Sequence, residues 1–228
     1  MMRRLLLPGA LALAVLGACS QQQSANDAAP TDDMSAHMGN GMGPGMDNHM
    51  GPIGNMGMHA QEPFAASERS MHQKMMAAVG VDPSDTWVRK MIEHHQGAVD
   101  MSREVLSLNP TEDVRRMAQM TVDKQSKEIE ELRGLIREGA PNQASAQLYM
   151  AADRDMMQRM MAASGANPSE SWTRKMIEHH RGALTMSDVV LANSPTAEVR
   201  RLAEKTKVDQ GKEIAELERM LQGSGSGA

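Results

Sequence analysis

An internal duplication constrains the fold of this chain more than any other feature. The stretch KMIEHHQGAVDMS at residues 90–102 returns as KMIEHHRGALTMS at residues 175–187. From Met71 to the end, the two copies align at a constant offset of 85 residues without a gap, so that Trp87 matches Trp172. The chain must therefore fold as two similar units, each carrying a pair of adjacent histidines.

The composition favours helices for both units. The chain holds 24 methionines but only two Trp, one Tyr and one Phe. A core must then be built from Met, Leu, Ile, Val and Ala, and the unbranched side chains among these suit helices and fill irregular gaps. The sequence predicts an all-α fold.

Three helices are expected in each copy. In the first copy they cover about residues 67–79, 84–108 and 111–136. Gly80 and Pro83 separate the first two helices, with Ser84 or Asp85 as the N-cap of the second, and Asn109-Pro110 is the expected N-cap and first-turn proline of the third. In the second copy, Gly165, Pro168 and Ser169 repeat the first break, and Ser194-Pro195 repeats the second. Short joints place neighbouring helices antiparallel, so the four long helices suffice for one bundle.

The N-terminus has the features of an export signal. Arg3 and Arg4 precede the apolar run LLLPGALALAVLG, which is too short to stay in a bilayer, and Leu16-Gly17-Ala18-Cys19 follows. This pattern resembles a bacterial lipoprotein signal, which implies that Cys19 is lipidated and becomes the mature N-terminus. The alternative is an ordinary secretory signal with a free thiol. Under the first interpretation we expect a lipid-anchored protein of the bacterial cell envelope, on the periplasmic or outer-membrane face.

These features divide the chain into six segments. The predicted boundaries are a signal peptide at 1–18, a flexible tether at 19–66, a first repeat at 67–139, a linker and start of the second repeat at 140–152, a second repeat at 153–222, and a flexible tail at 223–228. The tether is polar at first and then rich in Gly and Pro, which oppose helix formation.

The tether carries methionines and histidines that have no role in a core. Thioethers select Cu(I), and imidazole is an acceptable additional ligand. One hypothesis is a soft-metal tether that would also bind silver, and the alternative is a flexible linker whose methionines are incidental. The candidate ligands are Met34, His37, Met38, Met42, Met46, His49, Met50, Met56, Met58 and His59.

The paired histidines are the main candidate site. At about 100° per residue, a helix through residues 84–108 places His95 at the middle of its apolar surface and His94 at the edge, beside Met101. Met91 lies one turn before both histidines and can contact either. Ligation of a soft ion and simple core packing remain alternatives for these side chains. The bundle candidates are Met71, Met75, Met91, His94, His95 and Met101, with Met156, Met160, Met176, His179, His180 and Met186 in the second copy.

Residues around these candidates complete the prediction. Met76, Met157 and Met161 lie on the same short helices and are expected to face the histidines. Side chains of the third helices are expected to orient the histidines from behind. This second group comprises Gln125, Glu128, Gln210 and Glu213.

The repeated motif has a family resemblance. The pattern Met-Ile-x-His-His-x-Gly-Ala-x-x-Met, followed by Gln125-x-x-Glu128-Ile129, is similar to the ferritin-like family named domain of unknown function 305, over about residues 68–222. The resemblance implies a ferritin-like helical bundle, and copper binding in an exported protein linked to copper resistance. It implies ligands at the positions of Met91, His94, His95, Met101, Met176, His179, His180 and Met186. Glu93 and Glu178 stand where many members have proline.

Other function classes fit the sequence less well. The formal net charge is −5, and no block of Lys or Arg suggests nucleic acid as a partner. No nucleophile or phosphate loop is evident, and Glu93 and Glu178 face away from the core, which disfavours a di-iron oxidase. We therefore expect no enzymatic activity.

The preferred hypothesis is an exported protein that binds and buffers Cu(I), and also Ag(I), in support of copper resistance or homeostasis. Other copper-handling proteins are candidate partners. The alternative is a Met-rich bundle that binds apolar peptides or protein partners without metal.

Overall fold

The computed structural model describes residues 62–224. The expected signal peptide, Cys19 and all ten metal candidates of the tether lie outside these residues, as does the end of the expected tail. No helix between residues 62 and 224 is long and apolar enough to cross a membrane.

Seven helices and no strands make up the described residues, which confirms the all-α prediction. Each repeat contributes one shorter and two longer helices, and one additional short helix lies in the connection between the repeats. The helices are α1 (Ala65–Ala77), α2 (Pro83–Ser107), α3 (Glu112–Arg133), α4 (Gln143–Gln147), α5 (Met150–Ala162), α6 (Pro168–Ala192) and α7 (Ala197–Ser224).

The helix ends differ from the sequence prediction at identifiable places. Helix α1 begins at Ala65, inside the segment assigned to the tether, and α4 lies in the segment assigned to the linker and the start of the second repeat. The N-cap of α2 is Asp82, whose side chain accepts a hydrogen bond from the backbone N–H of Asp85 at 3.0 Å. Ser84 and Asp85 are therefore inside the helix, and Asn167 caps α6 in the same way.

The predicted N-caps of the third helices were also wrong. Asn109 and Ser194 have φ angles of 51° and 50°, in the left-handed region, and they follow the ends of α2 and α6. Each precedes a proline, which disfavours the right-handed helical conformation for the residue before it. Thr111 is the residue that precedes the first turn of α3.

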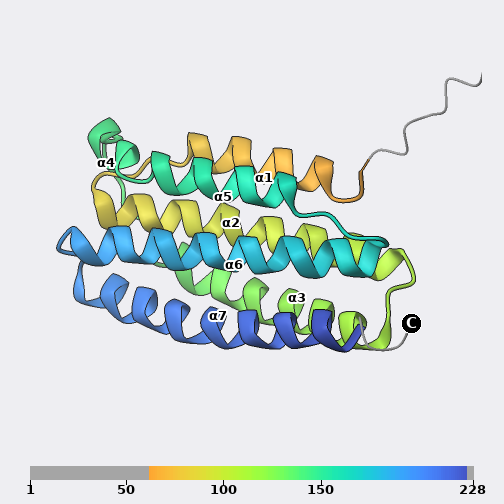
Figure 1. The fold of residues 1–228 in the computed structure, drawn as a ribbon. Helices are drawn as coiled ribbons and strands as arrows, with labels where there is room; N and C mark the ends of the chain where they lie inside the picture. The colour runs from red at the N-terminus through yellow and green to blue at the C-terminus, as the bar shows by residue number, and fades with distance from the viewer. Residues whose placement is uncertain (1–61, 225–228) are drawn as a thin grey trace, which may run out of the picture. The chain divides into compact units, whose positions relative to one another are not determined.

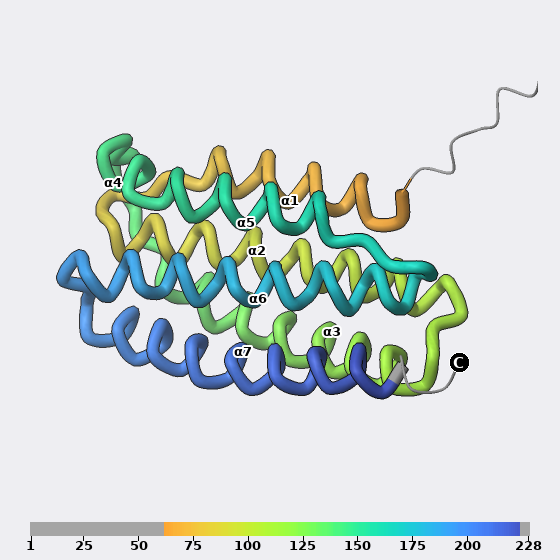
Figure 2. The backbone as a smooth tube through the Cα atoms, in the orientation of Figure 1, coloured from red at the N-terminus to blue at the C-terminus, as the bar shows by residue number. Residues whose placement is uncertain are grey.

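The six main helices form three layers, each containing one helix from each repeat (Figure 1). Helices α1 and α5 form the first layer, α2 and α6 the second, and α3 and α7 the third, as the backbone tube also shows (Figure 2). The two helices of the middle layer run antiparallel. The start of the third helix in each repeat contacts the start of the second helix in the other, through Thr111 N to Ser169 Oγ at 3.0 Å and Thr196 N to Ser84 Oγ at 3.1 Å. Equivalent contacts in both directions give the bundle an approximate two-fold axis.

Two buried ion pairs join the repeats across this axis. Lys90 Nζ lies 2.7 Å from Asp153 Oδ2, and Lys175 Nζ lies 2.9 Å from Glu68 Oε1. Each lysine also donates to a backbone carbonyl of its own repeat, that of Met75 at 2.7 Å and that of Met160 at 2.9 Å. The first layer, α1 and α5, which we call the outer layer, is thereby attached to the middle layer by ion pairs between the two repeats.

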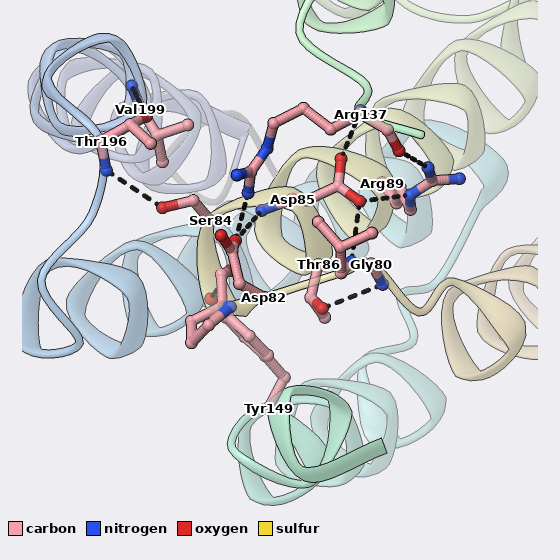
Figure 3. A network of polar contacts seen from close by, with 12 residues as sticks. Gly80, Asp82, Ser84, Asp85, Thr86, Arg89, Arg137, Tyr149, Thr196 and Val199 are labelled. Carbon is pink, nitrogen blue, oxygen red and sulfur yellow. Dashed lines mark hydrogen bonds and ion pairs between the residues drawn. The ribbon is translucent and has the colours of Figure 1, made fainter. Parts of the chain in front are cut away.

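A polar network at the start of α2 connects that helix to distant parts of the chain (Figure 3). The Asp85 carboxylate accepts from the backbone N–H groups of Val81 and Arg137 and from Arg89. The Tyr149 hydroxyl donates to the carbonyl of Pro83 at 2.7 Å. This network orients α2 and with it the histidines further along the helix.

Candidate metal centre

His94 and His179 meet at the centre of the bundle. Their rings stack with centroids 3.5 Å apart and an interplanar angle of 29°. The Nε2 of His94 lies 3.0 Å from the carbonyl oxygen of His179, and the Nε2 of His179 lies 2.9 Å from that of His94. Both side chains are completely buried, so the two repeats share one histidine pair on the approximate two-fold axis.

The partners of these rings fix where their protons lie. A carbonyl oxygen only accepts hydrogen bonds, so each Nε2 must carry the hydrogen, and Nδ1 of the neutral ring keeps its lone pair. Burial lowers the pKa of His94 and of His179 well below the ordinary value, and the charge of a neighbouring histidine lowers each further. Both rings are therefore neutral near pH 7.

His95 and His180 face the third layer of helices. The Nε2 of His95 lies 3.4 Å from Oε2 of Glu128, and the Nε2 of His180 lies 3.0 Å from Oε2 of Glu213. Burial acts to raise the pKa of Glu128, but hydrogen bonds and charges from His95, Lys205 and Lys124 lower it to about 2. Glu128 is thus ionised and orients the His95 ring with Nδ1 directed away from it.

The four histidines of the repeated motif share one unusual feature, which is a buried Nδ1 atom without a hydrogen-bond partner. This holds for His94, His95, His179 and His180 alike. A buried polar atom normally has a partner, because losing water without replacing its hydrogen bonds costs about 1–3 kcal/mol. Four such atoms, repeated in both copies of the motif, indicate ring nitrogens that are available to a ligand.

The position of His94 corrects the sequence prediction, which placed it at the edge of the apolar surface. The prediction assumed that α2 has one buried side. In the structure α2 lies in the middle layer, with α1 on one side, α3 on the other and α6 beside it (Figure 1). The buried surface therefore extends beyond the predicted arc to include Lys90, His94 and Gly97, and His94 is as central as His95.

The candidate methionines are buried side chains of the bundle. The Met71 side chain of α1 packs against Gly97 of α2, one turn after His94. A Cβ atom added at Gly97 would lie only 2.3 Å from the Met71 Sδ. Met156 makes the equivalent approach to Gly182, with its Sδ at 2.2 Å from a Cβ placed there. None of the eight bundle candidates is more than 2% exposed: Met71, Met75, Met91, Met101, Met156, Met160, Met176 and Met186.

Two of the methionines expected to face the histidines do not. Met76 is 43% exposed and Met161 is 59% exposed, whereas Met157 is buried. Met76 and Met161 each follow a buried methionine directly, and successive residues on a helix lie about 100° apart. That rotation takes both side chains out of the bundle.

Two of the four predicted supporting residues, Glu128 and Glu213, pair with the histidines. Gln125 and Gln210 are buried, and the Oε1 atom of each has no hydrogen-bond partner. Glu178, which the sequence placed away from the core, pairs with Arg181 at 2.5 Å and with Arg159 at 3.4 Å.

Within residues 62–224, no group of three or more His, Cys, Asp or Glu side chains is arranged to hold an ion. The structure thus assembles no zinc or di-iron type of ligand set there. The thioether sulfurs and neutral imidazole nitrogens of the candidate residues are soft, uncharged groups.

Comparison with known families gives a match to the model for a domain of unknown function (DUF305), over residues 14–136 and again over residues 137–221. The chain belongs to the DUF305 family. The boundary between the two matched segments, at residues 136 and 137, falls between the two structural repeats, so the molecule is a tandem DUF305 protein. No curated protein and no solved structure matches the chain.

Sequence reasoning missed the two buried lysines of this DUF305 protein. Lys90 and Lys175 directly precede the Met-Ile-Glu-His-His motif in both copies. Their repetition was a usable signal, because a lysine in an apolar surface requires a buried partner. The acidic partners, Glu68 and Asp153, also occupy equivalent positions, but their pairing across the repeats depends on how α1 and α5 are placed.

Proposed function

We propose that this chain binds and buffers Cu(I), and also Ag(I), at the histidine and methionine side chains of the bundle. The observation that carries the proposal is the set of four buried histidines whose Nδ1 atoms have no hydrogen-bond partner. Neutral imidazole and thioether groups are the ligands that soft monovalent ions prefer.

The geometry supports one ligand group in each repeat. In the first repeat His94 and His95 supply nitrogen, Met91 lies one turn before them, and the Met71 sulfur lies over Gly97. The equivalent residues of the second repeat are His179, His180, Met176 and Met156. Carboxylates behind coordinating histidines fix the ring orientation and raise ligand basicity, which is the role proposed for Glu128 and Glu213.

The remaining parts of the proposal concern residues that the structure does not describe. Lipidation of Cys19 would hold the protein at a membrane of the cell envelope, and the Met and His residues of the tether would capture soft ions or pass them on. The proposal includes no catalytic step. It makes the protein a store or carrier of ions.

A Cu(I) titration against a chromogenic chelator tests the bundle centre. In a chain lacking residues 34–59, His95→Leu combined with His180→Leu should keep the helical circular dichroism spectrum and lose Cu(I) bound by the bundle. Leucine is apolar and of similar size, so a merely packed histidine would tolerate this change. The matched control is Met76→Leu combined with Met161→Leu, which alters only exposed methionines. Full Cu(I) binding by the folded histidine variant would reject the proposal.

A further inference from the structure

Among the positions at which α1 and α5 differ, one exchanges a histidine for a methionine. His72 on α1 corresponds to Met157 on α5, whereas the residues on either side, Met71 and Gln73, have identical counterparts in Met156 and Gln158. The two repeats therefore place different soft ligands at one equivalent position.

The buried lysines show how α1 and α5 lie relative to each other. Lys90 contacts both the Met75 carbonyl on α1 and Asp153 on α5, so these two residues lie near each other. Lys175 likewise brings Met160 close to Glu68. The two helices are thus antiparallel and pass each other about midway between these contacts, at positions 71–72 and 156–157, on the approximate two-fold axis.

His72 and Met157 lie on the flanks of the helices that face each other. Glu68 is one turn before His72, and Asp153 is one turn before Met157, and both acidic side chains reach across to the other repeat. His72 and Met157 continue those flanks at the crossing point. Met157 is buried and His72 is half-buried, so this pair lies at an edge that solvent reaches.

Two polar atoms at this seam have no partner. They are Nδ1 of His72 and Oδ1 of Asp153, and both are buried. Burial raises the pKa of Asp153, while the charges of Lys90 and His72 act in the opposite direction. An imidazole nitrogen and a carboxylate oxygen without partners, together with the thioether of Met157, therefore lie on the facing flanks of α1 and α5.

We propose that His72 and Met157 hold one soft monovalent cation at the seam of α1 and α5, with Asp153 supplying negative charge beside it. This site occurs once per chain, because it lies on the axis that relates the repeats. It is adjacent in sequence to Met71 and Met156, whose sulfurs lie over the helices that carry the paired histidines. Because the paired histidines are fully buried, the half-buried seam provides an outer position for an ion that enters the bundle. The inference rests on the proposed function for the identity of the ion.

Nuclear magnetic resonance of the full chain with ¹⁵N-labelled histidine tests this site, using Ag(I) as a redox-stable probe. The chain has eight histidines, and His72→Gln assigns the His72 signals by their loss. On addition of Ag(I), the Nδ1 resonance of His72 should shift from the position of a free lone pair to that of a coordinated nitrogen. In Met157→Leu this response should be lost or should need a higher Ag(I) concentration, whereas Met161→Leu, which changes an exposed methionine of the same helix, should leave it unchanged.

The outcomes separate this inference from the proposed function. If the paired histidines respond to Ag(I) while His72 does not, the seam site is overturned and the buried centre stands. If His72 alone responds among the bundle histidines, the seam site stands and the buried centre fails. A His72 resonance that is unaffected by Ag(I) and reports a hydrogen bond to Asp153 would also overturn the seam site.

Discussion

His94 and His179 each place Nε2 against the backbone carbonyl of the other residue, at 3.0 and 2.9 Å, while their rings stack across the boundary between the repeats. This reciprocal contact joins two helices that are 85 residues apart in sequence. Burial keeps both rings neutral, and the contact through Nε2 leaves both Nδ1 lone pairs free. The contact that connects the repeats therefore also leaves the Nδ1 atom of each ring available as a ligand.

Stability should fall in mild acid because of this pair. The pKa of each ring is lowered in the folded state, so below about pH 6.5 the unfolded chain takes up protons that the folded chain does not. From pH 7.5 to 5.5 we expect a loss of about 1.4 kcal/mol for each histidine, or about 2.7 kcal/mol for both, in the free energy of unfolding. Urea denaturation at pH 7.5 and at pH 5.5 measures this loss in the free energy of unfolding.

The control for this prediction is His94→Leu combined with His179→Leu. The pKa values of Glu68 and Asp153 are raised by burial, which opposes the histidine effect in acid, so the difference between parent and variant is the quantity to compare. An equal pH dependence in both proteins would show that the stacked histidines are not the cause.

The close approach of Met71 to α2 makes Gly97 sensitive to substitution. In Gly97→Ala the new Cβ would lie 2.3 Å from the Met71 sulfur, and further atoms of that side chain are within 2.8 Å. We expect a loss of about 1–3 kcal/mol in unfolding free energy from overpacking, together with weaker Cu(I) binding if Met71 is a ligand. The matched control is Gly211→Ala, where no atom lies within 4 Å of the added Cβ. Because alanine favours helices, the control should gain about 0.5–1 kcal/mol.

The buried ion pair between Lys90 and Asp153 should contribute strongly to the attachment of the outer layer. Lys90→Met leaves the Asp153 carboxyl buried without a cation, which we expect to cost about 3–5 kcal/mol. The exposed pair of Arg133 and Glu130 provides the comparison, since Arg133→Met should cost at most about 1 kcal/mol. Chemical denaturation measures both.

A double variant separates charge burial from simple loss of contacts. Lys90→Met combined with Asp153→Leu removes both charges, and it should recover much of the stability lost in the single variant. If the double variant is as unstable as Lys90→Met, the loss does not come from an unpaired carboxyl group.

The lipoprotein prediction concerns Cys19, outside the described residues. Cys19→Ser should abolish labelling by a radioactive or clickable fatty acid and leave an unprocessed precursor in the envelope fraction. Normal processing of the variant would indicate an ordinary secretory signal.

Tether deletion provides a separate measurement of the Met and His residues before the bundle. Removing residues 34–59 should leave helicity and melting temperature nearly unchanged, because residues 34–59 are not expected to contribute to the core. The number of Cu(I) or Ag(I) ions bound should fall. An unchanged number would assign the tether methionines no role in binding.

The sequence alone determined the repeat, its three helices and the identity of the candidate ligands. A gap-free duplication, breaks at Gly80 and Gly165, and apolar residues at helical spacing are local properties, and they predict local structure. The adjacent histidines also suggested soft-metal chemistry before any contact was known. N-caps were predicted at Asn109 and Ser194, but these residues follow the ends of α2 and α6 in a left-handed conformation. A polar residue before proline is expected both where one helix ends and where the next begins, so the sequence pattern does not distinguish the two.

Only the tertiary structure decided which surfaces of these helices meet. A helical wheel assumes one buried side, but α2 and α6 lie in the middle layer and are buried on both sides (Figure 1). That arrangement moved His94 from a predicted edge to the two-fold axis and gave Lys90 and Lys175 their acidic partners in the other repeat. These contacts depend on the antiparallel placement of segments far apart in the chain. Helical periodicity specifies the direction of a side chain from its own helix, whereas its partner is specified by the assembly of the other helices around it.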